Sequence, residues 1–246
     1  MEYEVRLSKR IGDFDWHLSR GRWSSIPQRP ILRPCARPQG TQRERRETVK
    51  IKLYSAKGCP FARRTRIVLH EKGAEFEARE VDLQNRSEEF LKASPTGKVP
   101  VIVVDGDSLY ESSVVNQYLD EVYEESKLLP KDPKARAYAR IWMVHADAEL
   151  YPQVFVSSMG HMRGFPEERV SEALGKLKVT LSRLQEELQS SEYLAGDFSL
   201  ADIAHAGNFV RLHELEENGA ISLADYPNVV GWMERIETRE SFKAAG

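Results

Sequence analysis

The chain has 246 residues, of which 41% are hydrophobic and 30% are charged, and its formal net charge is −2. This length allows one large or two modest domains, and the near-neutral charge gives no case for binding nucleic acid or a membrane surface. The two cysteines, Cys35 and Cys59, exclude a disulfide framework and a cysteine-rich zinc site. Because no long apolar run or apolar N-terminal segment occurs, we expect a cytoplasmic protein.

Residues 1–48 are expected to form a disordered basic extension. They hold 11 Lys/Arg against 6 Asp/Glu, several prolines, and no apolar periodicity. A targeting or acid-binding arm is an alternative, although Glu2 and Glu4 argue against an organelle transit peptide. We favour a dispensable extension, or a start codon placed too far upstream.

Residues 49–126 are expected to form a domain of alternating strands and helices. Expected strands cover 49–54, 75–82, 99–104 and 108–110, and expected helices cover 61–72, 87–92 and 112–124. Ser87 is suited to cap the second helix, and Asp105-Gly106-Asp107 is a hairpin signal. The order βαβαββα predicts a thioredoxin-like fold.

The rest of the chain is expected to be an all-α domain. A linker over 127–133 contains two prolines and precedes helical periodicity over 134–158, 166–189, 199–217 and 226–239. Ser199 and Asp202 have the spacing of a capping box, so Ser199 is expected to begin the third helix. The predicted fold class is therefore α/β followed by all-α, with the helical domain over 134–246.

Cys59 is the candidate nucleophile. Pro60 suits the first helical position, so Cys59 is expected at the helix N-terminus, where free N–H groups and the helix dipole favour a thiolate. Arg63 and Arg64 add positive charge nearby. The alternative is that Cys59 is buried packing, as free cysteines commonly are.

Two further features could build a binding site. A cis bond at Val99–Pro100 would expose the Val99 backbone to an extended peptide, whereas a trans proline at a strand edge is the alternative. Glu111 and Ser112 lie where the last strand meets a helix and could hold an amine and a carboxylate together. Alternatively, Ser112 is only a helix cap and Glu111 only complements the helix dipole.

The motifs occur in the order Cys59–Leu69, Ser94–Val101 and Tyr110–Ser113, and together they resemble a cytosolic glutathione S-transferase. The match is most similar to the omega class, whose nucleophile is a cysteine. It covers residues 49–246 and thins in the helical half, where Leu194-Ala195-Gly196 and the Ser199 cap fit the family's folding motif. The resemblance implies a GST fold and an expected homodimer.

The resemblance also implies roles for individual residues, with glutathione as co-substrate. Cys59 would form a mixed disulfide with the glutathione sulfur. Val99, before a cis Pro100, would pair its backbone with the cysteinyl unit of glutathione. Glu111 and Ser112 would hold the γ-glutamyl amine and carboxylate.

The glycyl carboxylate of glutathione would be bound by a cation. Arg86 falls where omega enzymes commonly place a lysine, and Lys98 could serve the same carboxylate. Phe61, next to the cysteine motif, completes the expected glutathione site.

Two departures from the family pattern bear on the chemistry. Tyr54 and Ser55 lie near the positions from which tyrosine or serine transferases activate glutathione, yet a cysteine attacks sulfur itself and favours thiol exchange. Ala62 stands where a dithiol thioredoxin has its second cysteine, so glutathione must resolve the intermediate, and Cys35 is in the extension.

The expected function is therefore a glutathione-dependent thiol transferase or reductase that acts on a small electrophile, a disulfide or dehydroascorbate. Two alternatives remain open. One is a catabolic glutathione transferase of dehalogenase, ether-cleaving or isomerase type. The other is a regulatory protein that binds glutathione without turnover.

The electrophile would be met by the helix over 134–158, whose middle faces the substrate in this family. Tyr138, Trp142 and His145 are the candidates, followed along the helix by Tyr151 and Phe155. Most such aromatics pack in a core or a dimer contact instead. Since the histidines have no partners at metal-ligand spacing, we expect no metal.

Overall fold

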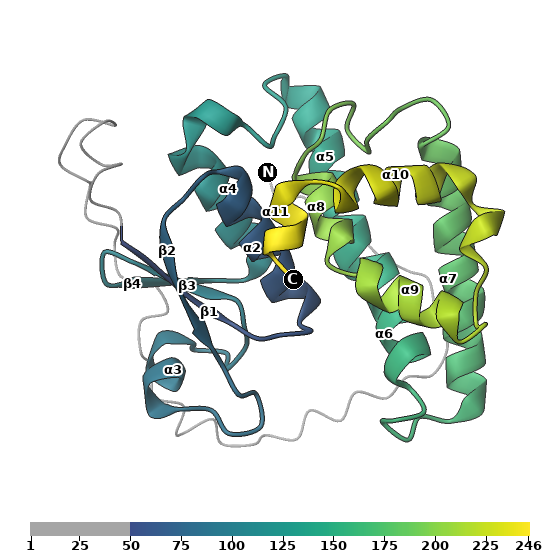
Figure 1. Ribbon diagram of the computed structural model, residues 1–246, viewed down its shortest axis with the longest axis horizontal. Coiled ribbons are helices and arrows are strands. Elements are labelled where there is room, and N and C mark those ends of the chain that lie inside the picture. The colour runs from purple at the N-terminus through teal and green to yellow at the C-terminus, as the bar shows by residue number, and fades with distance from the viewer. Residues whose placement is uncertain (1–49) are drawn as a thin grey trace, which may run out of the picture. The chain divides into compact units, whose positions relative to one another are not determined.

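The computed structural model describes residues 50–246, so the predictions for the extension and Cys35 lie outside the described residues. Its sheet has the strand order β2-β1-β3-β4 (Figure 1), with β1 parallel to β2 and the other neighbours antiparallel. The strands are β1 Ile51–Ser55, β2 Phe76–Glu80, β3 Val101–Val104 and β4 Asp107–Tyr110. Each lies within two residues of its predicted ends.

Helices cover both faces of this sheet (Figure 1), and the alternation of side chains along the strands explains why. The helices of this half are α2 Pro60–Glu71, α3 Glu88–Ala93 and α4 Ser112–Val122. Leu53 and Ile102 face α2 and α4, whereas Tyr54 and Val101 face Phe90 of α3. Ser87 caps α3 as predicted, because its Oγ accepts a hydrogen bond from Phe90 N at 3.2 Å.

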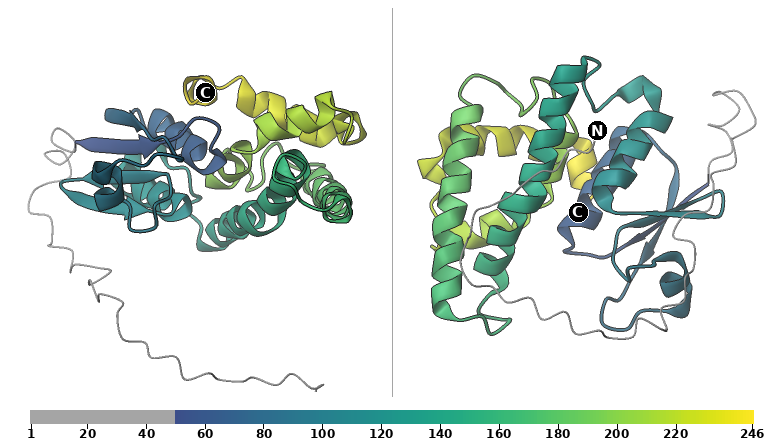
Figure 2. Two further views of the ribbon diagram at one scale, coloured as in Figure 1. Left: turned by 90° about the horizontal axis from the view of Figure 1, so that it is seen from below. Right: turned by 180° about the vertical axis from the view of Figure 1, so that it is seen from behind.

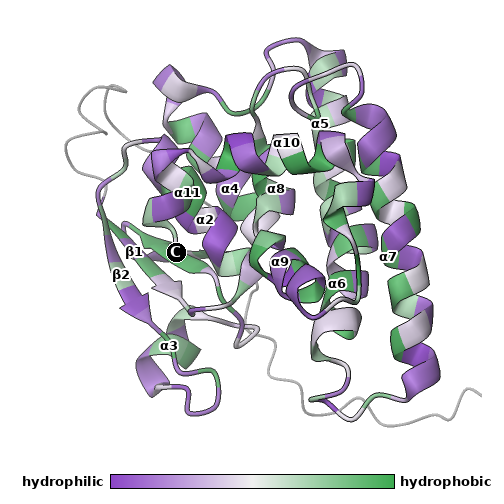
Figure 3. Cartoon of the chain, turned by 45° about the vertical axis from the view of Figure 1, so that its right-hand side comes forward, coloured by the Kyte–Doolittle hydropathy of each residue, from purple (hydrophilic) through white to green (hydrophobic). Residues whose placement is uncertain are grey.

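The second half is helical throughout the described residues, as the views in Figure 2 show. Its elements are η1 Glu124–Ser126, α5 Pro133–His145, η2 Ala146–Leu150, α6 Tyr151–Met159, α7 Glu167–Glu187, α8 Leu200–Ala206, α9 Phe209–Glu217, η3 Leu223–Asp225, α10 Pro227–Glu237 and α11 Glu240–Ala244. Along α7, hydrophobic and hydrophilic residues form separate stripes (Figure 3), and the apolar stripe with Leu177, Leu181 and Leu184 is buried. The predicted fold class, thioredoxin-like and then all-α, is confirmed.

Two predicted long helices are interrupted. The helix predicted over 134–158 contains the π-helical turn η2, directly before Pro152 in the first turn of α6. Proline has no N–H and its ring crowds the carbonyl four residues earlier, so a wider turn accommodates it.

The helix predicted over 199–217 breaks at Gly207 and Asn208. A Cβ at Gly207 would lie 2.4 Å from the carbonyl oxygen of Pro60, so α8 approaches the start of α2 as closely as only glycine allows. This contact joins the helical half to the residue that follows Cys59.

The capping box at the start of α8 is formed as predicted. The Ser199 hydroxyl accepts from Ala201 N, and the Asp202 carboxylate accepts from Ser199 N at 2.8 Å. The carboxylate also accepts from Leu194 N and from Trp232 Nε1 at 3.0 and 2.9 Å. Burial raises the pKa of Asp202 even though these donors favour its charged form.

The C-terminal helix α11, which the sequence analysis did not predict, packs against α2. Arg239 donates two hydrogen bonds to the Glu71 carboxylate at 2.8 and 2.9 Å. The Arg66 guanidinium donates to the Ala245 carbonyl at 3.0 Å, and Arg63 lies 4.3 Å above the Phe242 ring. Helix α2, which follows Cys59, is thus fixed by contacts with the C-terminal helix α11 and the residues that flank it.

Candidate functional site

Cys59 lies directly before α2, as the sequence predicted. Gly58, with φ +71°, turns the chain after β1, Cys59 is the N-cap residue, and Pro60 begins the helix. The thiol is half-buried, and its Sγ lies 4.0 Å from the carbonyl oxygen of Val99. Cys59 is therefore at a helix N-terminus, where the unpaired N–H groups face a partner outside the helix.

A pocket of about 100 Å³ lies next to Cys59, since it is lined by Val99, whose carbonyl oxygen is 4.0 Å from the Cys59 Sγ. Its lining residues are Phe61, Thr96, Lys98, Val99, Pro100, Tyr110, Glu111 and Ser112. Six of them were predicted as binding residues, and the fold brings them together. Thr96 and Tyr110 were not assigned, although both lie within the motifs that signalled the site.

The Val99–Pro100 peptide bond is cis. Val99 precedes β3, and in the described part of the chain no backbone group pairs with its N–H. Ser94 Oγ donates to the Lys98 carbonyl at 2.9 Å and fixes the loop before it. The Val99 backbone can therefore pair with an extended peptide in the pocket.

Glu111 is the N-cap residue of α4 and has an unusual backbone, with φ 65° and ψ 105°. A non-glycine residue in this region is strained, and such strain is found at functional sites. Its side chain is exposed, whereas Ser112 is buried at the first turn of the helix. The free N–H groups of that turn favour an anion, and the neighbouring carboxylate favours a cation.

Arg86 is exposed in the loop before α3 and is not among the residues that line the pocket. Lys98, which does line it, is the cation that the fold places there.

Tyr54 and Ser55, the alternative activating residues, are occupied elsewhere. The Tyr54 hydroxyl donates to Glu89 at 2.7 Å, and burial together with this carboxylate raises its pKa to about 12. Ser55 is buried and accepts a hydrogen bond from Arg66. The Tyr54 proton is thus engaged by Glu89 and Ser55 is only 2% exposed, so Cys59 is the candidate for the chemistry.

The arginines of α2 differ in their surroundings. Arg64 is buried, donates to Asp147 at 2.6 Å and stacks 4.5 Å from the Phe61 ring. Arg66, which was not predicted, interacts electrostatically with Cys59, and burial lowers its pKa. Arg66 is two turns after Cys59, on the same helix face, and this spacing could have identified it.

Trp142 and His145 do not line a substrate surface, and their prediction is corrected. They are only 6% and 3% exposed and pack against each other and His205 in the core. Tyr138, the third residue predicted for this surface, lies on the same helix and is 53% exposed, so its role stays a prediction.

Tyr151 instead faces the Cys59 region from the helical half. Its ring packs edge-on against Phe61 with 4.5 Å between centroids, and it interacts electrostatically with Cys59. It follows the π turn η2, whose extra residue turns the subsequent helix face relative to α5.

The two buried histidines, His145 and His205, are hydrogen-bonded to each other, and their partners determine which ring nitrogen carries the proton. His205 Nδ1 lies 2.7 Å from the Ala201 carbonyl, which can only accept, so this nitrogen donates. His205 Nε2 is then the acceptor for His145 Nδ1 at 3.0 Å. Burial lowers the pKa of both, to about 3 for His205, so both are neutral near pH 7.

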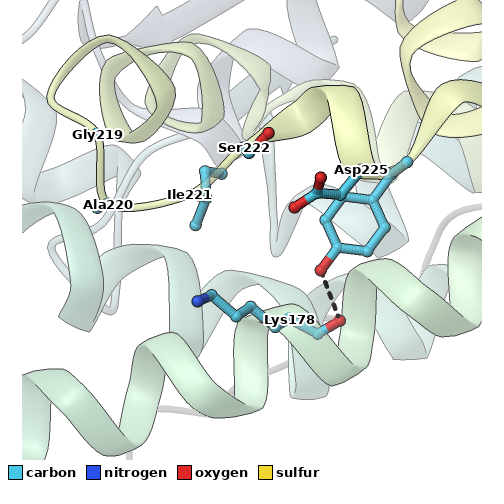
Figure 4. Close-up of a pocket in the computed structure, with 7 residues that line it drawn as sticks. Lys178, Gly219, Ala220, Ile221, Ser222 and Asp225 are labelled. Carbon is cyan, nitrogen blue, oxygen red and sulfur yellow. Dashed lines mark hydrogen bonds between the residues drawn. The ribbon is translucent and has the colours of Figure 1, made fainter.

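A second pocket, of about 270 Å³, lies between α7 and the connection from α9 to α10 (Figure 4). Lys178 and Asp225 line it, and the Tyr226 hydroxyl donates to the Lys178 carbonyl at 3.4 Å. It shares no residue with the pocket beside Cys59 and contains no cysteine. We therefore place the candidate chemistry in the smaller pocket.

Among residues 50–246, no group of three or more His, Cys, Asp or Glu side chains is arranged to hold a metal ion. Within the same residues, no helix is long and apolar enough to cross a membrane.

Comparison with known families agrees with this geometry. A family model described as "Glutathione S-transferase, N-terminal domain" matches residues 53–127, and one described as "Glutathione S-transferase, C-terminal domain" matches residues 148–240. Glutathione S-transferase U28 of Arabidopsis thaliana is 35% identical over 204 residues, which cover 81% of this chain and 89% of the relative.

Two solved structures are similar over most of their length, each with a TM-score of 0.72 and 28% sequence identity. Glutathione transferase Omega 3C from Trametes versicolor matches 83% of this chain and 92% of that chain. The β-etherase LigF from Sphingobium sp. strain SYK-6 matches 79% of this chain and 98% of that chain.

Proposed function

Because this chain belongs to the glutathione S-transferase family, we propose that it is a glutathione-dependent thiol transferase whose nucleophile is Cys59. The observation that carries the proposal is the half-buried Cys59 at the start of α2, with its Sγ 4.0 Å from the Val99 carbonyl. A glutathione cysteinyl unit paired with Val99 would bring its sulfur to this thiol. The positions of Tyr54 and Ser55 support the same choice, since both are held by other partners.

Glutathione binds across the pocket in this proposal. The Val99 backbone pairs with the cysteinyl unit, and the free N–H groups at the start of α4, together with Ser112, hold the γ-glutamyl carboxylate. Glu111 pairs with the γ-glutamyl amine. Lys98 holds the glycyl carboxylate, since it lines the pocket and Arg86 does not.

The reaction is two successive thiol exchanges. The Cys59 thiolate attacks the glutathione sulfur of a mixed disulfide, a new S–S bond forms, and the electron pair of the broken bond leaves with the partner thiolate. A second glutathione thiolate then attacks the glutathione sulfur bound to Cys59. Oxidised glutathione leaves and the Cys59 thiolate is regenerated. Ala62 offers no second thiol, so external glutathione completes the cycle.

The test compares the wild-type chain with Cys59→Ala and with Cys35→Ser as the matched control. Reduction of a glutathione mixed disulfide should fall by about 10³-fold or more in Cys59→Ala, because the nucleophile is lost. Cys35→Ser should retain the wild-type rate. Mass spectrometry should find one glutathione on the wild-type chain, removable by a reductant, and none on Cys59→Ala.

A Cys59→Ala variant that kept most of the disulfide reductase activity would overturn the mechanism. Cys59→Ser gives a complementary outcome, because a hydroxyl can only donate a hydrogen bond to the glutathione thiolate. We expect it to lose thiol transfer and to conjugate glutathione to chloro-nitroaromatics.

The likeness to a β-etherase favours a second candidate, glutathione-dependent cleavage of an aryl ether. In that case the glutathione thiolate attacks carbon, and Cys59→Ala retains turnover of the ether. A regulatory protein without turnover is the third outcome, recognised by tight glutathione binding with no reaction on disulfides, ethers or chloro-nitroaromatics.

We also propose that the chain pairs with a second copy through α4 and α5, since glutathione transferases are generally dimeric. These helices are neighbours, joined by a 2.8 Å hydrogen bond from Arg140 to Gln117. Val114 on α4 and Val144 on α5 are 57% and 63% exposed. Sedimentation should show a dimer that Val144→Glu weakens, whereas Val179→Glu, at a 71% exposed position on α7, leaves it intact.

A further inference from the structure

The pocket between α7 and the connection from α9 to α10 shares no residue with the pocket beside Cys59. The connection covers residues 219–226 and supplies every lining residue except Lys178, which comes from α7. In Figure 4 the Lys178 side chain reaches from α7 into the space below Ile221, and the Asp225 carboxylate projects from the connection towards the same space. The pocket therefore carries an ammonium on one wall and a carboxylate on the other.

These two charges have no partners of their own. Within residues 50–246, neither the Lys178 ammonium nor the Asp225 carboxylate forms an ion pair or a hydrogen bond, with each other or with another residue. The neighbouring lysine on α7 is different, because Lys176 pairs with Glu172 at 2.7 Å. Lys178 and Asp225 are thus available to a bound molecule.

The two walls of the pocket are fixed to each other. The Tyr226 hydroxyl donates to the Lys178 carbonyl at 3.4 Å (Figure 4). Beyond it, Asn228 donates two hydrogen bonds to Gln185 of α7, from its backbone N–H at 2.8 Å and from its side chain at 3.1 Å. Ile221 anchors the start of the connection, since its side chain is buried in the core. The pocket is therefore formed before any ligand arrives, and a ligand need not order the connection.

We propose that this pocket binds a zwitterionic α-amino acid with an apolar side chain. The amine of the ligand pairs with Asp225, its carboxylate pairs with Lys178, and its side chain lies against the half-buried ring of Tyr226. A simple anion would gain Lys178 but meet the like charge of Asp225, and a simple cation would meet the reverse, so a ligand with both charges is favoured.

The size of the pocket fits a ligand of this class. Its volume of about 270 Å³ lies just below the roughly 300 Å³ at which pockets for drug-sized ligands begin, so it suits a single amino acid. This site goes beyond the proposed function, because binding here needs neither Cys59 nor glutathione.

The experiment titrates the full isotope-labelled chain with three related probes. They are L-phenylalanine, hydrocinnamate, which lacks the amine, and phenethylamine, which lacks the carboxylate. Two-dimensional NMR follows the backbone amides of residues 219–226, which report binding at this pocket and not beside Cys59. We expect L-phenylalanine to bind with a Kd in the millimolar range, because exposed ion pairs are weak, and each single-charge probe to bind about tenfold more weakly.

Two variants separate the two charges. Lys178→Gln should lose about tenfold in affinity for L-phenylalanine and keep the weak affinity for phenethylamine. Asp225→Asn should also bind L-phenylalanine more weakly, but it should bind hydrocinnamate more tightly, because the repelling carboxylate is gone. Both side chains are exposed, so neither substitution should disturb the fold. Lys176→Gln is the matched control on the same helix and should bind all three probes as the wild type does.

Three outcomes would each overturn this inference. The first is that the amides of residues 219–226 do not shift at L-phenylalanine concentrations about ten times the expected Kd. The second is equal affinity for the three probes, and the third is unchanged affinity in Lys178→Gln. None of them bears on the thiol transferase proposal, which Cys59→Ala tests, and that variant should bind L-phenylalanine as tightly as the wild type.

Discussion

The two sides of Cys59 are built in different ways. On the pocket side, the decisive features belong to the backbone: the cis peptide before Pro100, the left-handed turn at Gly97 and the positive φ of Glu111. On the helical side, side chains from separate helices meet: Tyr151 of α6 packs against Phe61 of α2, and Arg211 of α9 donates to Ser158 Oγ of α6 at 3.5 Å. The first side depends on a few consecutive residues, whereas the second depends on how the helices pack.

This difference predicts how each side responds to substitution. A change on the pocket side should alter glutathione binding locally. A change in the helical half should reach Cys59 only where packing connects them, and the close approach of Gly207 to Pro60 is such a contact.

Gly207→Ala should have the largest effect. Its Cβ would lie 2.4 Å from the Pro60 carbonyl oxygen and 3.1 Å from the carbonyl carbon, so α8 or the start of α2 must move. Overpacking of this kind costs about 1–3 kcal/mol. We expect urea unfolding to show this loss and kcat to fall at saturating glutathione, because Cys59 is displaced.

Gly175→Ala is its control. Gly175 is inside α7 with no atom within 4 Å of the added methyl group, so this variant should gain about 0.5–1 kcal/mol and keep its kcat. If both variants were equally stable and active, the helical half would not set the position of Cys59.

Acidification should have the next largest effect, through His205. Its folded pKa is about 3, because burial opposes its charged form, and His145 beside it is lowered for the same reason. An unfolded histidine binds a proton near pH 6.5, so stability is full above that pH and is lost as the pH falls towards 3. Between pH 6.5 and 5, this amounts to about 2 kcal/mol for one histidine.

Urea unfolding at pH 7 and pH 5 measures this loss. His205→Gln should flatten the pH dependence, whereas His70→Gln, at an exposed position of α2, should leave it unchanged. An unaltered slope in His205→Gln would contradict the assignment of the acid sensitivity to the buried pair.

Glu111→Gly should change the stability least. Unlike the two changes above, it should stabilise the chain. Glycine tolerates φ 65°, so relief of strain should stabilise the chain by about 1 kcal/mol. Loss of the carboxylate should weaken glutathione binding about tenfold, measured by calorimetry. Asp105→Gly, at φ 51° in the hairpin between β3 and β4, should stabilise similarly without changing glutathione affinity.

The pocket side was largely predictable from the sequence. Cys59, Val99–Pro100 and Glu111-Ser112 each lie at the end of a strand or the start of a helix, and local signals mark such boundaries. Parallel and antiparallel pairing in one small sheet then brings these ends together. The capping box at Ser199 was predictable for the same reason, because its partners are three residues apart.

The helical side was decided by the tertiary structure. The sequence proposed Trp142 and His145 for the substrate surface, but both face the core, and Tyr151 faces Cys59 instead. The π turn between them adds a residue and rotates the later face by about 100°. Helical periodicity identifies an apolar face, yet it does not say which neighbour that face will meet.

The sequence by itself thus identified the candidate nucleophile and most of the residues that line the pocket beside it, because those residues lie at the ends of strands and helices, which local signals mark. The close approach of Gly207 to Pro60 and the packing of the Tyr151 ring on Phe61 were decided only by tertiary packing. Their partners are far apart in the chain, and only the packing of helices against the sheet domain brings them within reach.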